Sequence, residues 1–211
     1  MSTAPAVQFD DLPQQHAAGR LGLWLFLTNE ILFFGGFFAA YAFTRLNHPE
    51  AFAAASRRTD LPMGAAESVV LLLSSLTAML ALRAIRLDLR RYAAWLLSLT
   101  AALGLAFLVL HGMEYADEFR EHLLPGPGFD FPGPLAAQAE NFFFLYYTLT
   151  GFHGLHVAVG VALFTLYAVR TGRGRYDAAH HPQLELTVLY WHLVELVWVF
   201  LFPLLYLVDR A

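Results

Sequence analysis

The sequence predicts an all-α integral membrane protein, built as a bundle of five transmembrane helices. Hydrophobic residues make up 58% of the 211 residues, charged residues make up only 14%, and the mean hydropathy is +0.51. That composition is too apolar for a soluble chain of this length. We expect residues 1–211 to form a single transmembrane domain. Its five spans are predicted at residues 21–43, 65–86, 92–113, 141–169 and 186–208.

Each span is long enough for a helix, because about 20 residues cross the hydrocarbon layer. The first, residues 21–43, is apolar except for one acid, Glu30. The second carries the weakest signal, because Glu67 and three hydroxyl residues dilute it. The third and fourth are largely uninterrupted, and the last contains Pro203 near its end. None shows the short alternating pattern of barrel strands.

Glu30 is the most informative residue of the chain. It lies nine residues after Leu21, so it is roughly 14 Å deep at ~1.5 Å per residue, near the bilayer midplane. A carboxylate there is costly and normally faces a bundle interior, a polar partner or a water-filled path. Two interpretations remain open. Glu30 either is a neutral, hydrogen-bonded residue that packs helices together, or takes part in proton or lipid handling.

Other ionisable residues are predicted at a similar depth. The fourth span carries His153 and His156, three residues apart and so on one face, and the fifth carries His192 and Glu195 with the same spacing. If these faces point inward, they form one buried polar layer with Glu30. We expect a polar partner for Glu30 on the fourth span, with His156 favoured over His153.

We expect this chain to hold no haem, copper or other metal. Two His and two Glu could ligate iron, and a bis-His haem needs one His from each of two helices. The spans supply too few histidines for a desaturase-like di-iron site, and no ferritin-like Glu-x-x-His pair accompanies Glu30. The remaining ionisable groups near span ends are predicted to be interfacial: His111, Glu114, His180, His181 and Glu185.

Charge placement predicts the orientation. With a cytoplasmic N-terminus and a periplasmic C-terminus, eight of the 13 arginines fall on the cytoplasmic side and five on the outer side. Two longer connections then lie outside. Residues 44–64 are predicted to be a polar loop, and residues 114–140 begin acidic and continue as PGPGFDFPGP, which favours turns. The acidic run is either a solvated face or a surface for a basic partner such as a small electron carrier.

Several motifs together resemble one family. The segment LGLWLFLTNEILFFGGFFAAYAF resembles the first core helix of haem–copper oxidase subunit III, TGFHGLHVAVG resembles its most distinctive motif, and HHPQLELTVLYWHLVELVWVFLF resembles its C-terminal signature. HGMEY is similar to a weaker pattern that closes the third core helix. The resemblance spans about residues 20 to 208, and it is to the five-helix bacterial form of cytochrome c oxidase subunit III.

The resemblance implies a non-catalytic subunit of a proton-pumping terminal oxidase in the bacterial cytoplasmic membrane. Haem and copper would reside in partner subunits, with oxygen reduced in subunit I and electrons supplied by cytochrome c or quinol. This chain would pack against subunits I and II, bind phospholipids and support proton uptake; no nucleic acid partner is expected. Glu30 would match the family's buried carboxylate, and Arg170 an arginine that holds a lipid phosphate. Physically, a guanidinium at the interface suits a phosphodiester.

The chain also departs from the family. Glu195 replaces the usual Asp, Asn29 replaces a Ser, and the first two helices of the seven-helix members, which form one wall of a lipid cleft, are lacking. Three alternatives stay open: an accessory subunit of a nitric oxide reductase, a haem-bearing membrane redox protein, and a proton-coupled transporter using Glu30 and Glu195. The last would usually show inverted repeats, which are not visible here.

Overall fold

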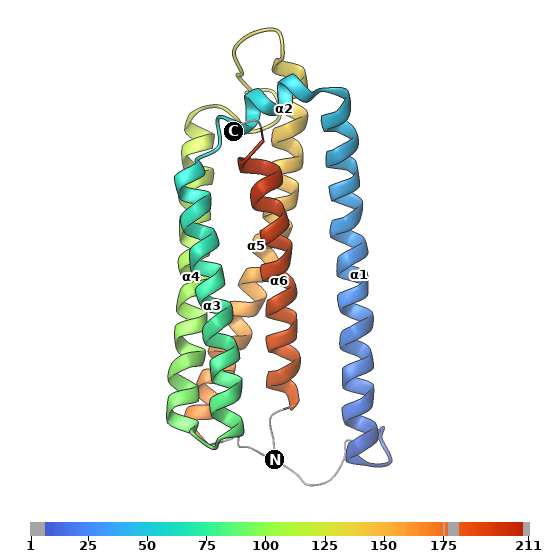
Figure 1. The fold of residues 1–211 in the computed structure, drawn as a ribbon, viewed down its shortest axis with the longest axis vertical. Helices are drawn as coiled ribbons and strands as arrows, with labels where there is room; N and C mark the ends of the chain where they lie inside the picture. The colour runs from blue at the N-terminus through green and yellow to red at the C-terminus, as the bar shows by residue number, and fades with distance from the viewer. Residues whose placement is uncertain (1–6, 175, 177–181, 209–211) are drawn as a thin grey trace.

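The computed structural model of the chain describes residues 7–174, 176 and 182–208. Its five long helices stand side by side along one axis (Figure 1), and each is long and apolar enough to cross a membrane. The prediction of five apolar spans in an all-α protein is therefore confirmed. In chain order the helices are α1 (Leu12–Asn47), α2 (Pro49–Ser56), α3 (Leu61–Arg86), α4 (Arg90–Arg120), α5 (Ala136–Gly172) and α6 (Pro182–Tyr206).

The helices begin where local chemistry favours a start. The Asp11 carboxylate accepts a hydrogen bond from the Gln14 amide at 2.7 Å, and Asp60 does the same for Met63 at 2.9 Å. Each aspartate is followed by a proline in the first turn, whose fixed φ suits a helix and whose missing N–H costs nothing there. These caps lie several residues before the apolar runs, so the helices are longer than the predicted spans.

The prediction of a plain polar loop at residues 44–64 is wrong. Residues Pro49–Ser56 form α2, an eight-residue helix with proline in its first turn and an alanine-rich body that favours helix formation. Its Phe52 side chain is fully buried and meets Tyr41 and Phe142 edge-on, with ring centroids 5.2 and 5.4 Å apart. The connection therefore packs across the end of the bundle, over α5.

The acidic run after residue 113 also differs from its prediction. It is helical as far as Arg120, because α4 continues beyond the apolar run. Glu114 and Glu118 are one turn apart and both are buried, whereas Asp117 is exposed and pairs with Arg120. This part of the run is therefore divided between the interior and the surface, and does not form a single solvated face.

The helices pack unequally. α3 and α4 form a tight antiparallel hairpin whose turn places Asp88 in the left-handed region, at φ 57°, and α5 and α6 pack against that pair. In contrast, α1 stands beside α5 and α6 at the edge of the bundle (Figure 1). Only 11% of the most apolar window of α1 is buried, against 33–44% in the other four long helices.

The polar residues that weaken the α3 signal face the core. Indole N–H groups of α6 donate to α3 hydroxyls: Trp191 to Ser74 and Trp198 to Ser68, both at 3.0 Å. These bonds satisfy groups that would otherwise be costly in a lipid environment. They join α3 to α6 along the centre of the bundle.

Candidate functional site

A carboxyl–imidazole pair joins α1 to α5 in the middle of both helices. Glu30 Oε2 lies 3.1 Å from His156 Nε2, and the two side chains are 12% and 18% exposed. Phe34 packs edge-on against the imidazole, and the Tyr190 hydroxyl of α6 donates to the His156 carbonyl at 2.8 Å. The expected polar partner of Glu30 on this helix is thus present, and it is His156.

The imidazole of His156 is also held within its own helix. Its Nδ1 lies 2.7 Å from the Phe152 carbonyl, which can only accept, so Nδ1 carries a hydrogen. Nε2 then faces Glu30 Oε2 at 3.1 Å, although Oε2 has no aligned hydrogen bond within the described residues. The pair is a close carboxyl–imidazole contact at the centre of the α1–α5 interface.

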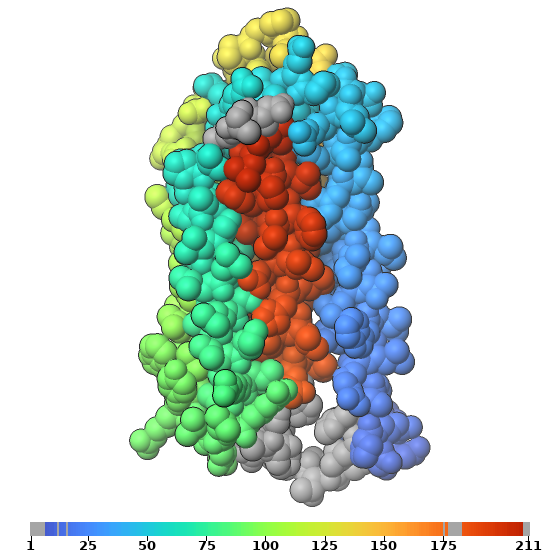
Figure 2. Space-filling view, in the orientation of Figure 1, coloured from blue at the N-terminus to red at the C-terminus, as the bar shows by residue number. Residues whose placement is uncertain are grey.

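An apolar groove of about 520 Å³ lies beside the pair, between α1 and the adjoining faces of α5 and α6. Figure 2 shows the opening between α1 and the lower half of α6. The helix α1 contributes Leu23 and Phe26, and Tyr190 of α6 lines the same space. From α5 come His156 and residues that follow it towards the C-terminal end of the helix. The groove is therefore mainly apolar, with the Glu30–His156 pair at one end.

One face of α5 lines this groove from His156 to Tyr167. His156, Val159, Leu163 and Tyr167 line it and are spaced by three or four residues, as neighbours on one helix face are. Arg170 continues the series and is half-buried. From His156 to Arg170 the helix rises roughly 21 Å, about half the ~40–45 Å bilayer with its headgroups. A guanidinium at Arg170 is thus one leaflet away from the Glu30–His156 pair.

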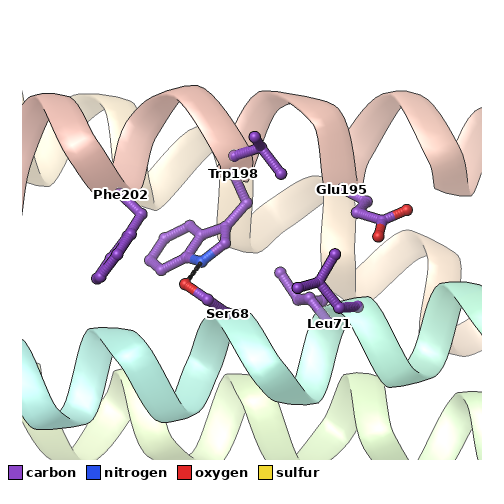
Figure 3. Close-up of a pocket in the computed structure, with 7 residues that line it drawn as sticks. Ser68, Leu71, Glu195, Trp198 and Phe202 are labelled. Carbon is purple, nitrogen blue, oxygen red and sulfur yellow. Dashed lines mark hydrogen bonds between the residues drawn. The ribbon is translucent and has the colours of Figure 1, made fainter.

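The other predicted members of the polar layer lie elsewhere. His192 Nδ1 is 2.6 Å from Ser75 Oγ of α3 and 3.4 Å from Glu195 Oε2. Glu195 lines a small pocket of about 200 Å³ between α3 and α6, beside the Trp198–Ser68 hydrogen bond (Figure 3). The single layer predicted from depth is therefore wrong, because α6 presents this pair to α3 and not to α1.

His153 is separate from both pairs. It is 1% exposed, stacks on Trp198 with ring centroids 5.2 Å apart, and meets Phe107 edge-on. Although His153 lies only three residues before His156, its ring packs in the bundle core while that of His156 contacts α1. Neither of its ring nitrogens has a hydrogen bond within the described part of the chain.

His111 and Glu114 do lie together, but the prediction that they are interfacial is wrong. The two groups are close, at 3.7 Å, but they are only 5% and 2% exposed and lie inside the bundle. Glu67 of α3 is 3.4 Å from the same imidazole nitrogen, and the Tyr206 hydroxyl donates to Glu114 at 2.7 Å. Both residues face inward because α4 continues through them as a helix packed on α3.

The interfacial residues near the start of α6 are only partly described. Glu185 forms an ion pair with Arg86 at 2.7 Å, and both side chains are substantially exposed. Such a pair adds little stability and fits a surface position. His180 and His181, also predicted to be interfacial, lie outside the described residues.

Comparison with known proteins covers the whole chain. The family model of cytochrome c oxidase subunit III matches residues 133–209, which contain His156, Arg170 and Glu195. A cytochrome c oxidase subunit 3 of Thermostichus vulcanus is 35% identical, with 99% of this chain and 96% of that protein covered. The chain belongs to the cytochrome c oxidase subunit III family. It is therefore a multi-pass membrane protein of a respiratory oxidase.

Two further subunit III relatives extend the match. The cytochrome c oxidase subunit 3 of Bacillus sp. (strain PS3) is 31% identical over 90% of this chain and 86% of that protein. That of the fish Tetraodon nigroviridis is also 31% identical, over 89% of this chain and 68% of that protein. The likeness therefore includes the first span with Glu30, which the family-model match leaves out.

Within this subunit III chain, sequence reasoning missed several residues of the buried polar clusters. In the sequence, Glu67 stands out only as a residue that weakens a span, and Tyr190 and Tyr206 do not stand out. A signal for Glu67 was available: a carboxylate inside an apolar helix is itself unusual. No comparable signal marks the tyrosines, because their hydroxyl partners depend on how the helices are rotated.

Proposed function

We propose that this subunit III holds a phospholipid in the groove between α1, α5 and α6, and thereby stabilises the helix α1 that carries the Glu30–His156 pair. In this proposal the chain contains no redox centre. Haem and copper lie in partner subunits, electrons pass from cytochrome c to oxygen in subunit I, and protons are pumped. The observation that carries the proposal is the continuous apolar face of α5 between His156 and Arg170.

The chemistry of the groove suits one acyl chain with its headgroup. Its walls are aliphatic and aromatic, from Leu23 and Phe26 on α1 to Leu163 and Tyr167 on α5. A volume of about 520 Å³ is in the usual range for a small-molecule site. Arg170 lies about one leaflet thickness from His156 along α5 and is half-buried. Its guanidinium can therefore bind a phosphate through two N–H groups while its aliphatic stem packs along the helix.

The Glu30–His156 pair supports a part in proton uptake. It places a carboxyl and an imidazole next to a groove, at the depth where an ionisable group in a membrane usually has a function. In this proposal the pair supports subunit I and is not a catalytic group. Nothing in the pair can reduce oxygen, so its loss should shorten the time over which the oxidase stays active before it lowers the initial rate of oxygen reduction.

The charge distribution supports a cytoplasmic N-terminus. Among the described residues, seven arginines lie near the end of the bundle that holds the start of α1 and the α3–α4 turn, and four near the other end. The first group is Arg20, Arg83, Arg86, Arg90, Arg91, Arg170 and Arg173. In this orientation the lipid headgroup at Arg170 belongs to the cytoplasmic leaflet.

Association with subunit I is supported by the open side of α1. A methyl group added at Gly35 or Gly36 would meet no atom of this chain, so both glycines face away from its own helices. Small residues on a free helix face let another helix approach closely. We therefore place the contact with a partner helix along this face.

The test is the lipid content of the purified oxidase complex, measured by native mass spectrometry. Arg170→Ala should lose one bound phospholipid, and Arg45→Ala, which alters a half-buried arginine at the other end of the bundle, should keep it. Val159→Trp should also expel the lipid by filling the groove. Val109→Trp, on an exposed face of α4, is its control. Equal lipid content in all four variants would refute the proposal.

A further inference from the structure

A second buried cluster lies between α3 and α4, away from the groove. It consists of Glu67 on α3 and of His111 and Glu114 on α4, whose ligating atoms all lie within 4.8 Å of one another. The three residues are 0%, 5% and 2% exposed. The groove near Glu30 and the pocket at Glu195 include none of them.

Most polar atoms of this cluster lack a hydrogen-bond partner within the described residues. Neither oxygen of Glu67 and neither ring nitrogen of His111 has a hydrogen bond within the described residues, and Glu114 lacks one on Oε1. The imidazole packs between aromatic rings, and the polar groups near it within the described residues are the two carboxyls. Among the described residues no arginine pairs with these carboxyls. Buried polar groups are normally satisfied, and each one left open costs free energy. A group that accepts all three ligands at once would remove this cost.

The distances fit a first-row transition-metal ion. His111 Nδ1 is 3.4 Å from Glu67 Oε1 and 3.7 Å from Glu114 Oε2. Ligands at ~2.0–2.2 Å from a tetrahedral Zn²⁺ are separated by roughly 3.3–3.6 Å, so small side-chain movements suffice. Imidazole disfavours Ca²⁺ and Mg²⁺, which prefer oxygen, and two carboxylates balance the charge of a divalent ion.

The surroundings suit a metal site in two further ways. The Tyr206 hydroxyl of α6 donates to Glu114 Oε2 at 2.7 Å and contacts Tyr146 at 3.2 Å, which fixes the carboxylate as outer-shell partners do. Glu118, one turn beyond Glu114, is also buried, so a further carboxyl group lies next to the cluster.

We propose that Glu67, His111 and Glu114 bind one Zn²⁺ ion, with a water or a second carboxylate oxygen as the fourth ligand. The ion joins α3 to α4 and, through Tyr206, to α6. Because Zn²⁺ has no redox chemistry, its role here is structural. This site is independent of the lipid groove and of the Glu30–His156 pair.

The test uses the intact oxidase complex, washed with EDTA, supplied with ZnCl₂ and desalted. Zinc per haem is then measured by mass spectrometry. Glu67→Gln and His111→Gln should each lose about one zinc per complex relative to wild type. Glu195→Gln and His192→Gln, which alter the carboxyl–imidazole pair facing α3 from α6, are the matched controls and should keep it. Equal zinc in all five proteins would overturn the proposal.

A second measurement covers the case in which the variants fail to assemble. An anomalous difference map of the wild-type complex, recorded at the zinc absorption edge, should show a peak between the three side chains. A map without that peak would overturn the proposal, whatever the variants do. Prolonged incubation of the wild-type complex with chelator should also lower its unfolding temperature.

Discussion

At the scale of single residues, glycines decide where α6 fits into the bundle. A methyl group built on Gly160 of α5 would lie 2.2 Å from the Trp191 ring, and one on Gly104 of α4 would lie 2.7 Å from Val161. Trp191 is fully buried and its indole is held by Ser74, so it has no free space to move into. Glycine at 160 therefore makes room for a tryptophan side chain.

Gly160→Ala should destabilise the subunit by ~1–3 kcal/mol, because the added methyl forces the indole off its hydrogen bond or α6 away from α5. Thermal unfolding of the assembled complex measures this as a lower unfolding temperature of subunit III. Gly22→Ala is the control, because a methyl group there meets nothing within 4 Å. If both alanine variants unfold at the wild-type temperature, the close Trp191 packing is not real.

Two substitutions of Glu30 can separate a role of its carboxyl in proton uptake from a role in packing. Glu30→Gln keeps a polar, hydrogen-bonding side chain of the same size but cannot release a proton, whereas Glu30→Ala removes both. We expect initial oxygen reduction to be nearly normal in both variants, since no catalytic group is lost. If the pair serves proton uptake, Glu30→Gln should lose activity during sustained turnover as fast as Glu30→Ala.

The measurement is oxygen consumption followed over many turnovers, in complexes with equal haem content. Wild-type endurance in Glu30→Gln, with loss only in Glu30→Ala, would assign Glu30 to packing or lipid retention instead. Immediate and complete inactivation of either assembled variant would contradict the whole assignment of this pair as non-catalytic.

At the scale of elements, the short helix α2 closes one end of the bundle. It follows α1 after a single residue, His48, and packs against α5 through a cluster of buried rings. The Ser56 hydroxyl also donates to the Leu205 carbonyl near the end of α6 at 2.8 Å. The helix thus holds one set of ends of α1, α5 and α6 together in a way that a flexible loop could not.

Phe52→Ala should therefore cost about 3–5 kcal/mol, the usual effect of removing a fully buried phenylalanine. The expected readout is a lower unfolding temperature and a faster release of subunit III from the complex in detergent. Phe43→Ala is the matched control, because Phe43 is 72% exposed on the neighbouring end of α1. Equal effects of the two substitutions would show that burial under α2 contributes nothing.

The spans could be predicted from sequence because length and hydropathy alone define them. The short α2 could not, because eight residues between two polar segments give no periodic signal long enough to identify. Depth along the chain correctly matched Glu30 with His156. It failed for His192 and Glu195, because depth does not report the rotation of a helix about its own axis. Predicting the Glu67–His111–Glu114 cluster would have required both the depth of each residue and the rotation of each helix, so only the structure revealed it.

At the scale of the whole molecule, one helix is held much less firmly than the others. The most apolar window of α1 is 11% buried, and the groove separates much of α1 from α5 and α6. Its polar contacts with α5 and α6 include the Glu30–His156 pair near the middle and, at one end, Tyr41, whose hydroxyl donates to the Leu204 carbonyl. Between these two points α1 touches α5 and α6 through aromatic rings, such as Phe33 on Phe152. In the proposed function, bound lipid completes the packing of the part of α1 before Glu30.

Removal of lipid should accordingly loosen α1 before any other helix. After phospholipase treatment of the purified complex, hydrogen exchange should rise first in the part of α1 that precedes Glu30, while α3 and α4 stay protected. Readdition of phospholipid should restore protection of α1. Uniform loosening of all five long helices, or none in α1, would show that its position does not depend on lipid.

The loose attachment of α1 also bears on how the chain is made. Ribosomes deliver α1 first, but its partners α5 and α6 come last, and His156 follows Glu30 by more than a hundred residues. At ~5–20 residues per second the carboxyl waits on the order of 10 s for its imidazole. Until α5 has been synthesised, Glu30 is therefore without the imidazole that lies 3.1 Å from it in the finished protein.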